Sequence, residues 1–458
     1  MEFHQIYFVG AGGIGMAALE RYYLQKEVPV AGYDRTPSEL TAALESEGAQ
    51  LCFEDIPEKA IPEAFRDTET TLVVYTPAIP ADNRVLNYFR EGGFKVEKRA
   101  ALLGEITRGT KALCFAGTHG KTTTSSMAAH MMHSSKAGCS AFLGGVLRNY
   151  NSNYLVDTGS RYSVVEADEF DRSFHHLRPY VAVITATDPD HLDIYGDEAG
   201  YLEGFARFTE LVRPDGALIS HTGLKLKPRP QEGVRVYSYS KEEGDFHAEN
   251  IRIGNGEIWF DFVGPDIRIA DIQLGVPVKV NIANGVAAIA LAWMNGVTPE
   301  EIRRGMASFG GPKRRFDFHL KKDNIVLIDD YAHHPAELAA SIQSVKELYA
   351  GRKVTGIFQP HLYTRTRDFA PDFAASLSLL DELILLDIYP AREEPIPGVT
   401  SEIIFDAVTI PSRKLIRKSE LLDLVAKEAD TFEVVLMVGA GDIDRLIEPV
   451  KQILDKKL

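Results

Sequence analysis

Short apolar runs recur along the chain, and most are followed by polar residues and then by a helical pattern of apolar positions. Short continuous runs bounded by glycine, proline, threonine or acidic residues are typical of strands buried in a parallel sheet. The alternation of such strands with helices predicts an α/β fold. The runs stand at residues 5–9, 71–75, 113–116, 162–165, 181–184, 325–328, 354–358, 382–386 and 434–438.

The chain has 458 residues, which is too long for one ordinary hydrophobic core, so two or three domains are expected. Gly310-Gly311-Pro312 breaks the helical pattern and predicts a linker. We predict a Rossmann-like N-terminal domain, a central P-loop-type α/β domain with a β-rich excursion near residues 245–280, and a C-terminal Rossmann-like α/β domain. Their expected bounds are residues 1–108, 109–312 and 313–458.

The first strand leads into the glycine-rich turn G-A-G-G-I-G at residues 10–15 and then into a helix, and a second strand ends at Asp34. This spacing matches the dinucleotide-binding fingerprint. The fingerprint specifies a pyrophosphate at a helix N-terminus and a ribose hydroxyl near an acid, and a UDP-sugar carries both groups. An NAD-dependent oxidoreductase or a nonenzymatic NAD sensor is an alternative. The candidate residues are Gly12, Gly13, Ile14, Gly15, Asp34, Thr76 and Arg99.

A second glycine-bounded turn, A-G-T-H-G-K-T-T-T at residues 116–124, lies between an apolar strand and a helix. The unpaired N–H groups and the dipole at such a helix N-terminus favour phosphate. Lys121 can reach β- and γ-phosphate oxygens, and the Thr122 hydroxyl can bind Mg²⁺. ATP with Mg²⁺ is therefore the predicted ligand, and the candidate residues of the loop are Gly117, Thr118, His119, Gly120, Lys121, Thr122 and Thr123.

Acidic residues and a histidine follow the next two strands. Glu166 directly follows the run at residues 162–165, and His191 lies in D-P-D-H-L-D at residues 188–193. The carboxyl ends of parallel strands meet at one edge of a sheet, where ligand groups gather. Beside a phosphate loop, such side chains predict a Mg²⁺ site, with Mn²⁺ able to substitute.

The strands of the last third also end in polar clusters, D-D-Y-A-H-H-P at residues 329–335 and Q-P-H-L-Y-T-R-T-R-D at residues 359–368. Histidine and arginine side chains at neighbouring strand ends suit a small molecule that carries a carboxylate. Beside sites for a nucleoside diphosphate and for ATP, such a site suits a joining reaction driven by ATP. These clusters contain Tyr331, His333, His361, Arg365 and Arg367.

Composition excludes several classes of protein. The formal net charge of −15 argues against a general nucleic-acid-binding protein, which would need a basic face. The three cysteines are scattered and form no C-x-x-C pair, so a disulfide framework is not expected and a reducing cytoplasm fits. No apolar run approaches the length of a membrane-spanning helix, so membrane insertion is not expected.

Together these motifs resemble those of the Mur ligase family along nearly the whole chain. The loop at residues 116–124 and F-Q-P-H-L-Y-T-R-T-R-D at residues 358–368 are highly specific in combination, whereas the turn at residues 10–15 alone is weak. The other shared motifs are E-A-D-E-F-D at residues 166–171, D-H-L-D at residues 190–193, R-R-F-D at residues 314–317 and D-D-Y-A-H-H-P at residues 329–335.

The resemblance implies amide formation in peptidoglycan precursor synthesis. ATP would phosphorylate the lactyl carboxylate of UDP-N-acetylmuramate, and the amine of L-alanine would attack the acyl phosphate, with release of ADP and phosphate. Positioning and charge neutralisation would supply most of the catalysis. The resemblance assigns Lys121, Glu166, His191, His333 and Arg365 to catalysis, Asn281, Asn284, Arg314 and Arg315 to ATP, and His119 to both the ATP loop and the UDP-sugar. It also implies that the metal ligands are Thr122, Glu166 and His191, and that the amino acid is bound by Tyr331, His333, His361, Arg365 and Arg367.

The chain departs from the family pattern at Ala186, Val280 and Leu362, where relatives usually have Asn, His and Arg. Residues 194–212 hold no lysine, so the carbamylated lysine of several relatives cannot form there. We hypothesise that Glu198 or Glu203 supplies that negative charge. A related ligase that adds a recycled tripeptide to the same UDP-sugar is the nearest alternative. The chain is expected to act in the cytoplasm as a monomer or homodimer.

Overall fold

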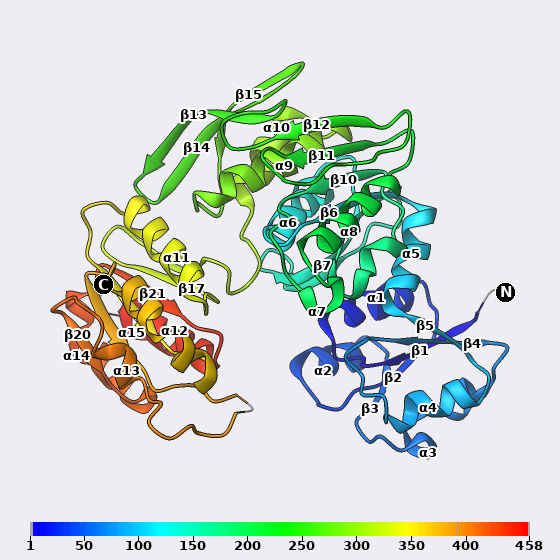
Figure 1. Ribbon diagram of the computed structural model, residues 1–458, viewed down its shortest axis with the longest axis horizontal. Helices are drawn as coiled ribbons and strands as arrows, with labels where there is room; N and C mark the ends of the chain where they lie inside the picture. The colour runs from blue at the N-terminus through cyan, green and yellow to red at the C-terminus, as the bar shows by residue number, and fades with distance from the viewer. Residues whose placement is uncertain (1–2, 392, 457–458) are drawn as a thin grey trace. The chain divides into compact units, whose positions relative to one another are not determined.

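The structure is a computed structural model that describes residues 3–391 and 393–456, folded as two compact units (Figure 1). The first unit runs as far as Glu249 and also contains Asp261–Ile272 and Ile282–Phe309. The second contains Asn250–Phe260, Gln273–Asn281 and the chain from Gly310 onward. The division after Phe309 thus falls at the predicted linker, while the domain boundaries near residues 108 and 312 stay predictions.

The first unit begins with a five-stranded parallel sheet in the order β3-β2-β1-β4-β5. The strand order reverses between β1 and β4, and ligands bind outside the carboxyl ends of strands at such a switch point. The glycine-rich turn follows β1 there. The strands are β1 (Gln5–Val9), β2 (Val30–Tyr33), β3 (Gln50–Cys52), β4 (Thr71–Tyr75) and β5 (Lys95–Lys98), and the helices are α1 (Ile14–Leu24), α2 (Glu39–Ser46), α3 (Pro57–Ala60), α4 (Arg84–Glu91) and α5 (Arg99–Gly109).

A seven-stranded sheet follows in the order β12-β11-β10-β6-β9-β7-β8, parallel except for the β7–β8 pair. Strand β6 is central, so the ends of β10 and β9 flank the phosphate loop that follows it. The strands are β6 (Lys111–Ala116), β7 (Ser140–Leu147), β8 (Ser152–Leu155), β9 (Tyr162–Glu166), β10 (Val181–Ile184), β11 (Ala217–His221) and β12 (Arg235–Tyr239), and the helices include α6 (Lys121–His133), α7 (Leu192–Tyr195) and α8 (Glu198–Glu210).

The predicted β-rich excursion is confirmed as a three-stranded sheet in the order β13-β14-β15. Its strands are β13 (His247–Gly254), β14 (Glu257–Gly264) and β15 (Ile267–Gln273), and helices α9 (Val280–Met294) and α10 (Pro299–Ser308) follow.

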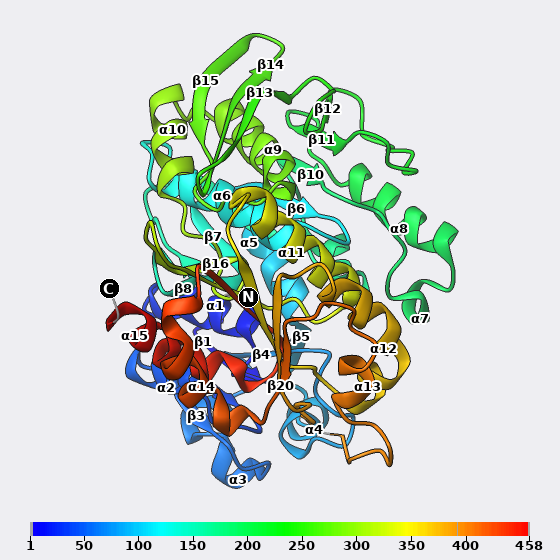
Figure 2. The ribbon, with the colours of Figure 1, turned by 90° about the vertical axis from the view of Figure 1, so that its left-hand side faces the viewer.

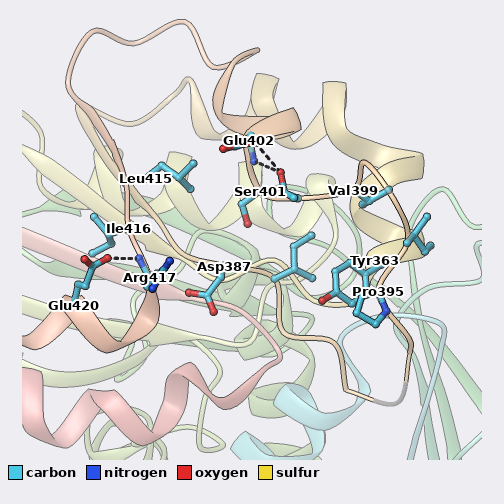
Figure 3. A pocket seen from close by; sticks show the side chains of 13 residues that line it. Tyr363, Asp387, Pro395, Val399, Ser401, Glu402, Leu415, Ile416, Arg417 and Glu420 are labelled. Atoms are coloured by element: carbon cyan, nitrogen blue, oxygen red, sulfur yellow. Dashed lines mark hydrogen bonds between the residues drawn. The ribbon is translucent and has the colours of Figure 1, made fainter.

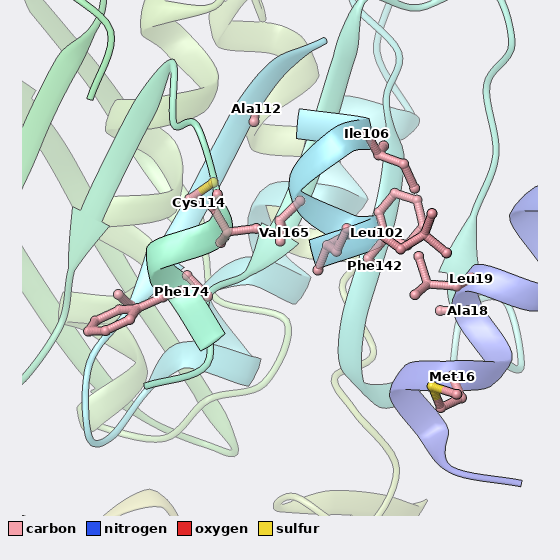
Figure 4. Close-up of a cluster of buried hydrophobic side chains, with 14 of the residues drawn as sticks. Met16, Ala18, Leu19, Leu102, Ile106, Ala112, Cys114, Phe142, Val165 and Phe174 are labelled. Atoms are coloured by element: carbon pink, nitrogen blue, oxygen red, sulfur yellow. The ribbon is translucent and has the colours of Figure 1, made fainter. Parts of the chain in front are cut away.

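The two sheets of the first unit share one hydrophobic core. Figure 4 shows Leu19 of α1 and Leu102 and Ile106 of α5 in the same buried cluster as Phe142 and Val165 of the seven-stranded sheet. These side chains are at most 7% exposed. Burial of apolar area of this kind is the main source of folding free energy, and it holds the turn after β1 and the loop after β6 in one unit.

The second unit holds a six-stranded sheet in the order β16-β17-β21-β18-β19-β20, parallel except for the β16–β17 pair. Helices α11 and α12 lie side by side in both ribbon views (Figures 1 and 2). The strands are β16 (Asp317–Lys321), β17 (Val326–Asp330), β18 (Val354–Phe358), β19 (Glu382–Leu385), β20 (Arg413–Leu415) and β21 (Val434–Val438), and the helices are α11 (Pro335–Leu348), α12 (Tyr363–Leu377), α13 (Glu402–Phe405), α14 (Leu421–Glu428) and α15 (Ile447–Lys456).

One helix of the second unit begins earlier than its sequence pattern indicates. The apolar pattern predicts a helix from residue 369, whereas α12 starts at Tyr363 and includes Arg365 and Arg367 in its first turns. The helix is kinked at Phe369, because Pro371 cannot continue an undistorted helix from the preceding turn. The two arginines therefore project from a helix and not from an irregular strand-end loop.

All three cysteines are unpaired, in agreement with the expectation from their spacing. Among the described residues, no helix is both long and apolar enough to cross a membrane.

The carboxyl group of Glu20 on α1 is fully buried, and neither of its oxygens has a hydrogen-bond partner among the described residues. Burial raises the pKa of Glu20 well above its usual value, and Asp34 adds to the effect. The folded state therefore keeps its proton at pH values where the unfolded state has lost it. Between the pKa of Glu20 in the unfolded state and its higher pKa in the folded state, each rise of one pH unit lowers the free energy of unfolding by about 1.4 kcal/mol.

We expect Glu20→Gln to stabilise the protein increasingly as the pH rises from 5 to 8, because glutamine cannot ionise in the unfolded state. Thermal unfolding of both proteins at several pH values measures the effect. Glu45→Gln, at an exposed position of α2, is the matched control and should show a constant difference from wild type. A constant difference for Glu20→Gln as well would contradict the prediction.

Candidate active site

The phosphate loop lies between β6 and α6 and is braced by the end of β10. Gly117 and Gly120 have φ angles of +143° and +82°, which favour glycine. A Cβ atom on Gly117 would lie 2.2 Å from the Thr185 hydroxyl oxygen, so a larger residue would not fit. The Thr185 hydroxyl donates to the carbonyl of His119, and the Thr118 N–H donates to the carbonyl of Ala186. Because this last contact uses backbone, the Asn-to-Ala departure leaves it in place.

Helix α6 presents its N-terminus to this loop, and no side chain caps it. Uncapped N–H groups and the helix dipole together form a site for an anion. The fold therefore has the predicted strand–loop–helix geometry, with Lys121 as the first residue of α6, and phosphate binding at this loop stays a prediction.

Lys121 is held beside a buried carboxylate. Its Nζ donates to Glu169 Oε1 at 2.8 Å and to the carbonyl of Gly117 at 2.6 Å. Glu169 is only 2% exposed. Burial raises the pKa of Glu169, while the Lys121 ammonium opposes that rise. Sequence reasoning assigned no role to Glu169, and its position in the E-A-D-E-F-D motif was the available signal.

Two of the three predicted metal ligands lie together. The Thr122 hydroxyl donates to Glu166 Oε1 at 3.0 Å, and the N–H of Gly144 donates to Glu166 Oε2 at the same distance. Burial raises the pKa of Glu166, and both hydrogen bonds oppose that rise. A hydroxyl and a carboxylate are hard oxygen ligands of the kind that Mg²⁺ prefers. Sequence reasoning missed Gly144, which lies on β7, a strand that it did not predict.

His191, the third predicted ligand, stands at the N-terminus of α7 with a φ angle of +52°. Its ring lies 5.2 Å from that of Phe170, and Nε2 is 3.8 Å from an Asp190 carboxylate oxygen. Within residues 3–391 and 393–456, no three His, Cys, Asp or Glu side chains cluster closely enough to hold a metal alone. Mg²⁺ binds through few protein ligands and completes its shell with phosphate and water, so Thr122 and Glu166 fit such a site.

A cavity of about 390 Å³ connects the glycine-rich turn with the carboxylate of Glu166. Arg99 Nη2 lies 3.7 Å from Asp168 Oδ2 at its border. Gly12 donates its N–H to Asp34 Oδ2 at 2.7 Å, which fixes the turn against the end of β2. The predicted residues that line the cavity are Gly13, Ile14, Gly15, Thr76, Arg99 and Glu166, all from the first unit.

We expect Gly15→Ala to raise the KM for the UDP-sugar about tenfold, a loss of roughly 1.4 kcal/mol of binding free energy. A Cβ atom there would lie 2.7 Å from Arg99 Nη1, so the Arg99 guanidinium must shift from its place at the cavity. Gly109→Ala is the control, because a Cβ atom at Gly109 has no neighbour within 4 Å. Steady-state kinetics with varied UDP-sugar measures both, and equal KM values for the two variants would contradict the prediction.

In the second unit, three predicted residues form a row of rings at the ends of β17 and β18. The ring centroids of Tyr331 and His333 are 5.3 Å apart, and those of His333 and His361 are 6.4 Å apart. His361 in turn stacks on Tyr389 at 5.8 Å. The aromatic row therefore brings together two strand ends that are separate in the sequence.

The two predicted arginines of α12 differ in their surroundings. Arg367 is exposed and pairs with Asp368 at 2.7 Å. Arg365 is half-buried, and no described residue forms an ion pair or hydrogen bond with its guanidinium. Arg365 is thus the better placed of the two to bind an added carboxylate.

A second cavity, of about 630 Å³, lies beside this region in the second unit (Figure 3). Its lining comes from the ends of β19 and β20, from α13 and from Tyr363 at the start of α12. Ile388 and Val399 give it buried apolar walls, and Asp387 and Arg417 stand at its rim. None of the described residues that line it was a sequence-predicted site residue.

Comparison with known proteins finds three family domains along the chain. The Mur ligase family catalytic domain matches residues 5–111, the Mur ligase middle domain matches residues 115–292, and the Mur ligase glutamate ligase domain matches residues 314–441. The UDP-N-acetylmuramate–L-alanine ligase of Parabacteroides distasonis is 67% identical over 99% of this chain and 98% of its own length. The chain belongs to the Mur ligase family. The three-domain α/β architecture is thereby confirmed.

Other Mur ligases agree with this assignment. A UDP-N-acetylmuramate–L-alanine ligase of Phocaeicola vulgatus is 59% identical over 99% of this chain and 98% of its own length. The crystal structure of the UDP-N-acetylmuramate–alanine ligase MurC of Thermotoga maritima superposes with a TM-score of 0.78 at 26% identity, covering 99% of both chains. A murein peptide ligase of Psychrobacter arcticus shares the fold, with a TM-score of 0.62, 21% identity, and coverage of 99% of this chain and 98% of its own.

Three of the four remaining predicted ATP residues have partners within the described chain. Asn284 accepts a hydrogen bond from the Thr124 hydroxyl at 3.1 Å, and Asn281 donates its side-chain N–H to the carbonyl of Val276 at 3.2 Å. Arg314 directs its guanidinium at groups of its own unit, whereas Arg315 is exposed. The assignment of these four residues to ATP stays a prediction.

The hypothesis that Glu198 or Glu203 replaces the carbamylated lysine gains no support from this geometry. Glu198 pairs with Lys225, and Glu203 pairs with Arg229, in exposed contacts of 2.6 Å. The carboxylate that lies against Lys121 is Glu169. Carboxylate charge is therefore present beside the loop, but it comes from the end of β9 and not from α8.

Proposed function

We propose that this Mur ligase joins L-alanine to the lactyl carboxylate of UDP-N-acetylmuramate with consumption of ATP. Two relatives that are 67% and 59% identical to this chain are named for that activity. The observation that carries the proposal is the 390 Å³ cavity, in which the glycine-rich turn, Arg99 and Glu166 line one space. A UDP-sugar bound at that turn would point its far end toward the phosphate loop, where the γ-phosphate of ATP would be held.

The chemistry requires activation of a carboxylate, which is a poor electrophile until it carries a good leaving group. Lys121 and the N-terminus of α6 would hold the γ-phosphate in line with the lactyl carboxylate. Thr122 and Glu166 would hold Mg²⁺, with Mn²⁺ able to substitute, and the ion neutralises charge on the phosphates when bound. His191 is proposed as a further ligand from the same edge of the sheet.

The second substrate would bind in the second unit. Arg365 would hold the carboxylate of L-alanine, and Tyr331, His333 and His361 would surround its amine. Attack forms the C–N bond, and collapse of the tetrahedral intermediate expels phosphate. Histidine suits such a position, because near neutral pH it can accept a proton from the ammonium group of L-alanine, which leaves the neutral amine that attacks.

We place this activity in the cytoplasm, where ATP and UDP-sugars occur, with the chain acting as a monomer or homodimer. Addition of a recycled tripeptide to the same UDP-sugar is the nearest competing reaction. The segment at residues 389–398, Y-P-A-R-E-E-P-I-P-G, favours the alanine-adding type. A protein that only binds NAD would not need Lys121, Glu169 or the phosphate loop.

The test is phosphate release from ATP in the presence of UDP-N-acetylmuramate, with and without L-alanine. We expect L-alanine to stimulate release strongly, and the tripeptide L-Ala-γ-D-Glu-diaminopimelate to have little effect. Release that L-alanine does not stimulate would contradict the proposal. Stimulation by the tripeptide alone would identify the competing reaction.

A further inference from the structure

Arg314 occupies a strained position just before β16. Its φ angle is +60°, a left-handed conformation that a residue with a side chain rarely adopts. Its carbonyl accepts the N–H of Tyr331 at 2.8 Å, and its own N–H donates to Asp317 Oδ2 at 3.3 Å. The strain is therefore maintained by contacts to β16 and to the residue that follows β17. Strained residues of this kind tend to occur where the chain positions functional groups.

The guanidinium of Arg314 contacts three further groups of the second unit. Nη2 donates to the carbonyl of Gly439 at 2.6 Å, Nε lies 3.4 Å from Asp329 Oδ2, and Nη1 lies 3.5 Å from Asp444 Oδ2. The guanidinium also lies over the Tyr331 ring, 5.0 Å from its centroid. One side chain thus connects the end of β17 with the loop that follows β21.

Of the two carboxylates that lie beside the Arg314 guanidinium, that of Asp329 is the buried one. It is 1% exposed, and neither carboxylate oxygen has a hydrogen bond among the described residues. Burial raises the pKa of Asp329 to about 7, with Arg314 and His319 lowering it and Asp317 and Asp330 raising it. The Arg314 guanidinium is therefore the main group that compensates this buried carboxylate, since a buried charge without a partner is costly.

We propose that Arg314 and Asp329 form a positioning pair that fixes Tyr331 and His333 for the amine substrate, while Arg315 is the arginine available to the ATP phosphates. The inference rests on the proposed function, in which the aromatic row of the second unit receives L-alanine. Arg314 donates a hydrogen bond to the carbonyl of Gly439 and forms ion pairs with Asp329 and Asp444. Arg315 is exposed, and no described residue forms an ion pair or hydrogen bond with its side chain.

The test compares Arg314→Ala, Asp329→Asn and Arg315→Ala in the full-length enzyme by steady-state kinetics. We expect Arg314→Ala and Asp329→Asn each to raise the KM for L-alanine about tenfold, as loss of an indirect positioning contact does, with the KM for UDP-N-acetylmuramate unchanged. The double variant should be no worse than the more severe single variant, because the two residues act as one unit. Arg315→Ala should instead raise the KM for ATP.

Arg352→Ala is the matched control. Arg352 also donates to a carbonyl, that of Glu433 at 2.7 Å, and lies over a tyrosine ring, that of Tyr349 at 5.4 Å. We expect its kinetic constants to equal those of wild type. An equal rise in the KM for L-alanine in Arg352→Ala would show a general effect of packing and overturn the inference.

If Arg314→Ala does not fold, Arg314→Lys tests the inference in its place. Lysine keeps the charge but lacks the planar fork, so we expect the KM for L-alanine to stay raised. A raised KM for ATP with an unchanged KM for L-alanine in Arg314→Lys or Asp329→Asn would place Arg314 on the phosphates and overturn the inference. Wild-type enzyme that L-alanine does not stimulate would contradict the proposed function itself, so the two failures are distinguishable.

Discussion

Replacement of Lys121 by alanine is expected to lower kcat about a thousandfold while the protein stays folded, because a cation that stabilises a transferring phosphoryl group supplies several kcal/mol to the transition state. Lys121 is the first residue of α6, and its Nζ already lies 2.8 Å from Glu169 and 2.6 Å from the Gly117 carbonyl. These two contacts hold the ammonium at the loop before any phosphate binds. The measurement is phosphate release at saturating substrates.

The same substitution leaves Glu169 buried without its cation, so a loss of stability must be separated from a loss of catalysis. The double variant Lys121→Ala with Glu169→Gln removes that unpaired charge and should regain most of the thermal stability but none of the activity. Lys225→Ala is the matched control, since Lys225 forms an exposed pair with Glu198. Near-normal kcat in Lys121→Ala would contradict the assignment of the loop to the γ-phosphate.

Glu166→Gln is expected to lower kcat about a hundredfold and to raise the Mg²⁺ concentration that is needed for half-maximal rate. The carboxylate accepts hydrogen bonds from the Thr122 hydroxyl and from the N–H of Gly144, both at 3.0 Å. Glutamine keeps the shape and one carbonyl acceptor but loses the negative charge that attracts the ion. Titration of activity with Mg²⁺ measures the effect.

Glu198→Gln serves as the control for this second prediction, because it removes a carboxylate from the exposed face of α8. Its Mg²⁺ dependence should match that of wild type. If Glu166→Gln also keeps the wild-type Mg²⁺ dependence, Glu166 does not hold the metal. If Glu198→Gln alone alters it, the hypothesis that a residue of α8 replaces the carbamylated lysine would be restored.

Much of the fold follows from local patterns in the sequence. The runs at residues 5–9, 71–75 and 354–358 are strands with those bounds, because buried parallel strands need continuous apolar residues. The glycine-rich turn and the phosphate loop lie at the carboxyl ends of β1 and β6, where their spacing places them. The start of α12 was not predicted, because polar residues at 363–368 carry no apolar pattern.

In the candidate site, too, some features follow from the local sequence and others depend on the tertiary structure. The residue types of the loop from Gly117 to Thr122 indicate phosphate and Mg²⁺ on their own, since their chemistry depends only on neighbours in the chain. Glu169 and Gly144 were missed because their roles depend on partners 48 and 22 residues away. The difference between Arg314 and Arg315, which are adjacent in sequence, depends on backbone direction at a left-handed residue.

The sequence by itself thus determined the α/β architecture, because strand periodicity and turn chemistry are local properties, and its motifs identified the family and the reaction class through their resemblance to those of known ligases. Only the tertiary structure decided which carboxylate compensates Lys121 and which arginine is held by Asp329. It also showed that the glycine-rich turn and Glu166 line one cavity. These features depend on distance and desolvation between segments that are far apart in the chain, and no local pattern of residues encodes them.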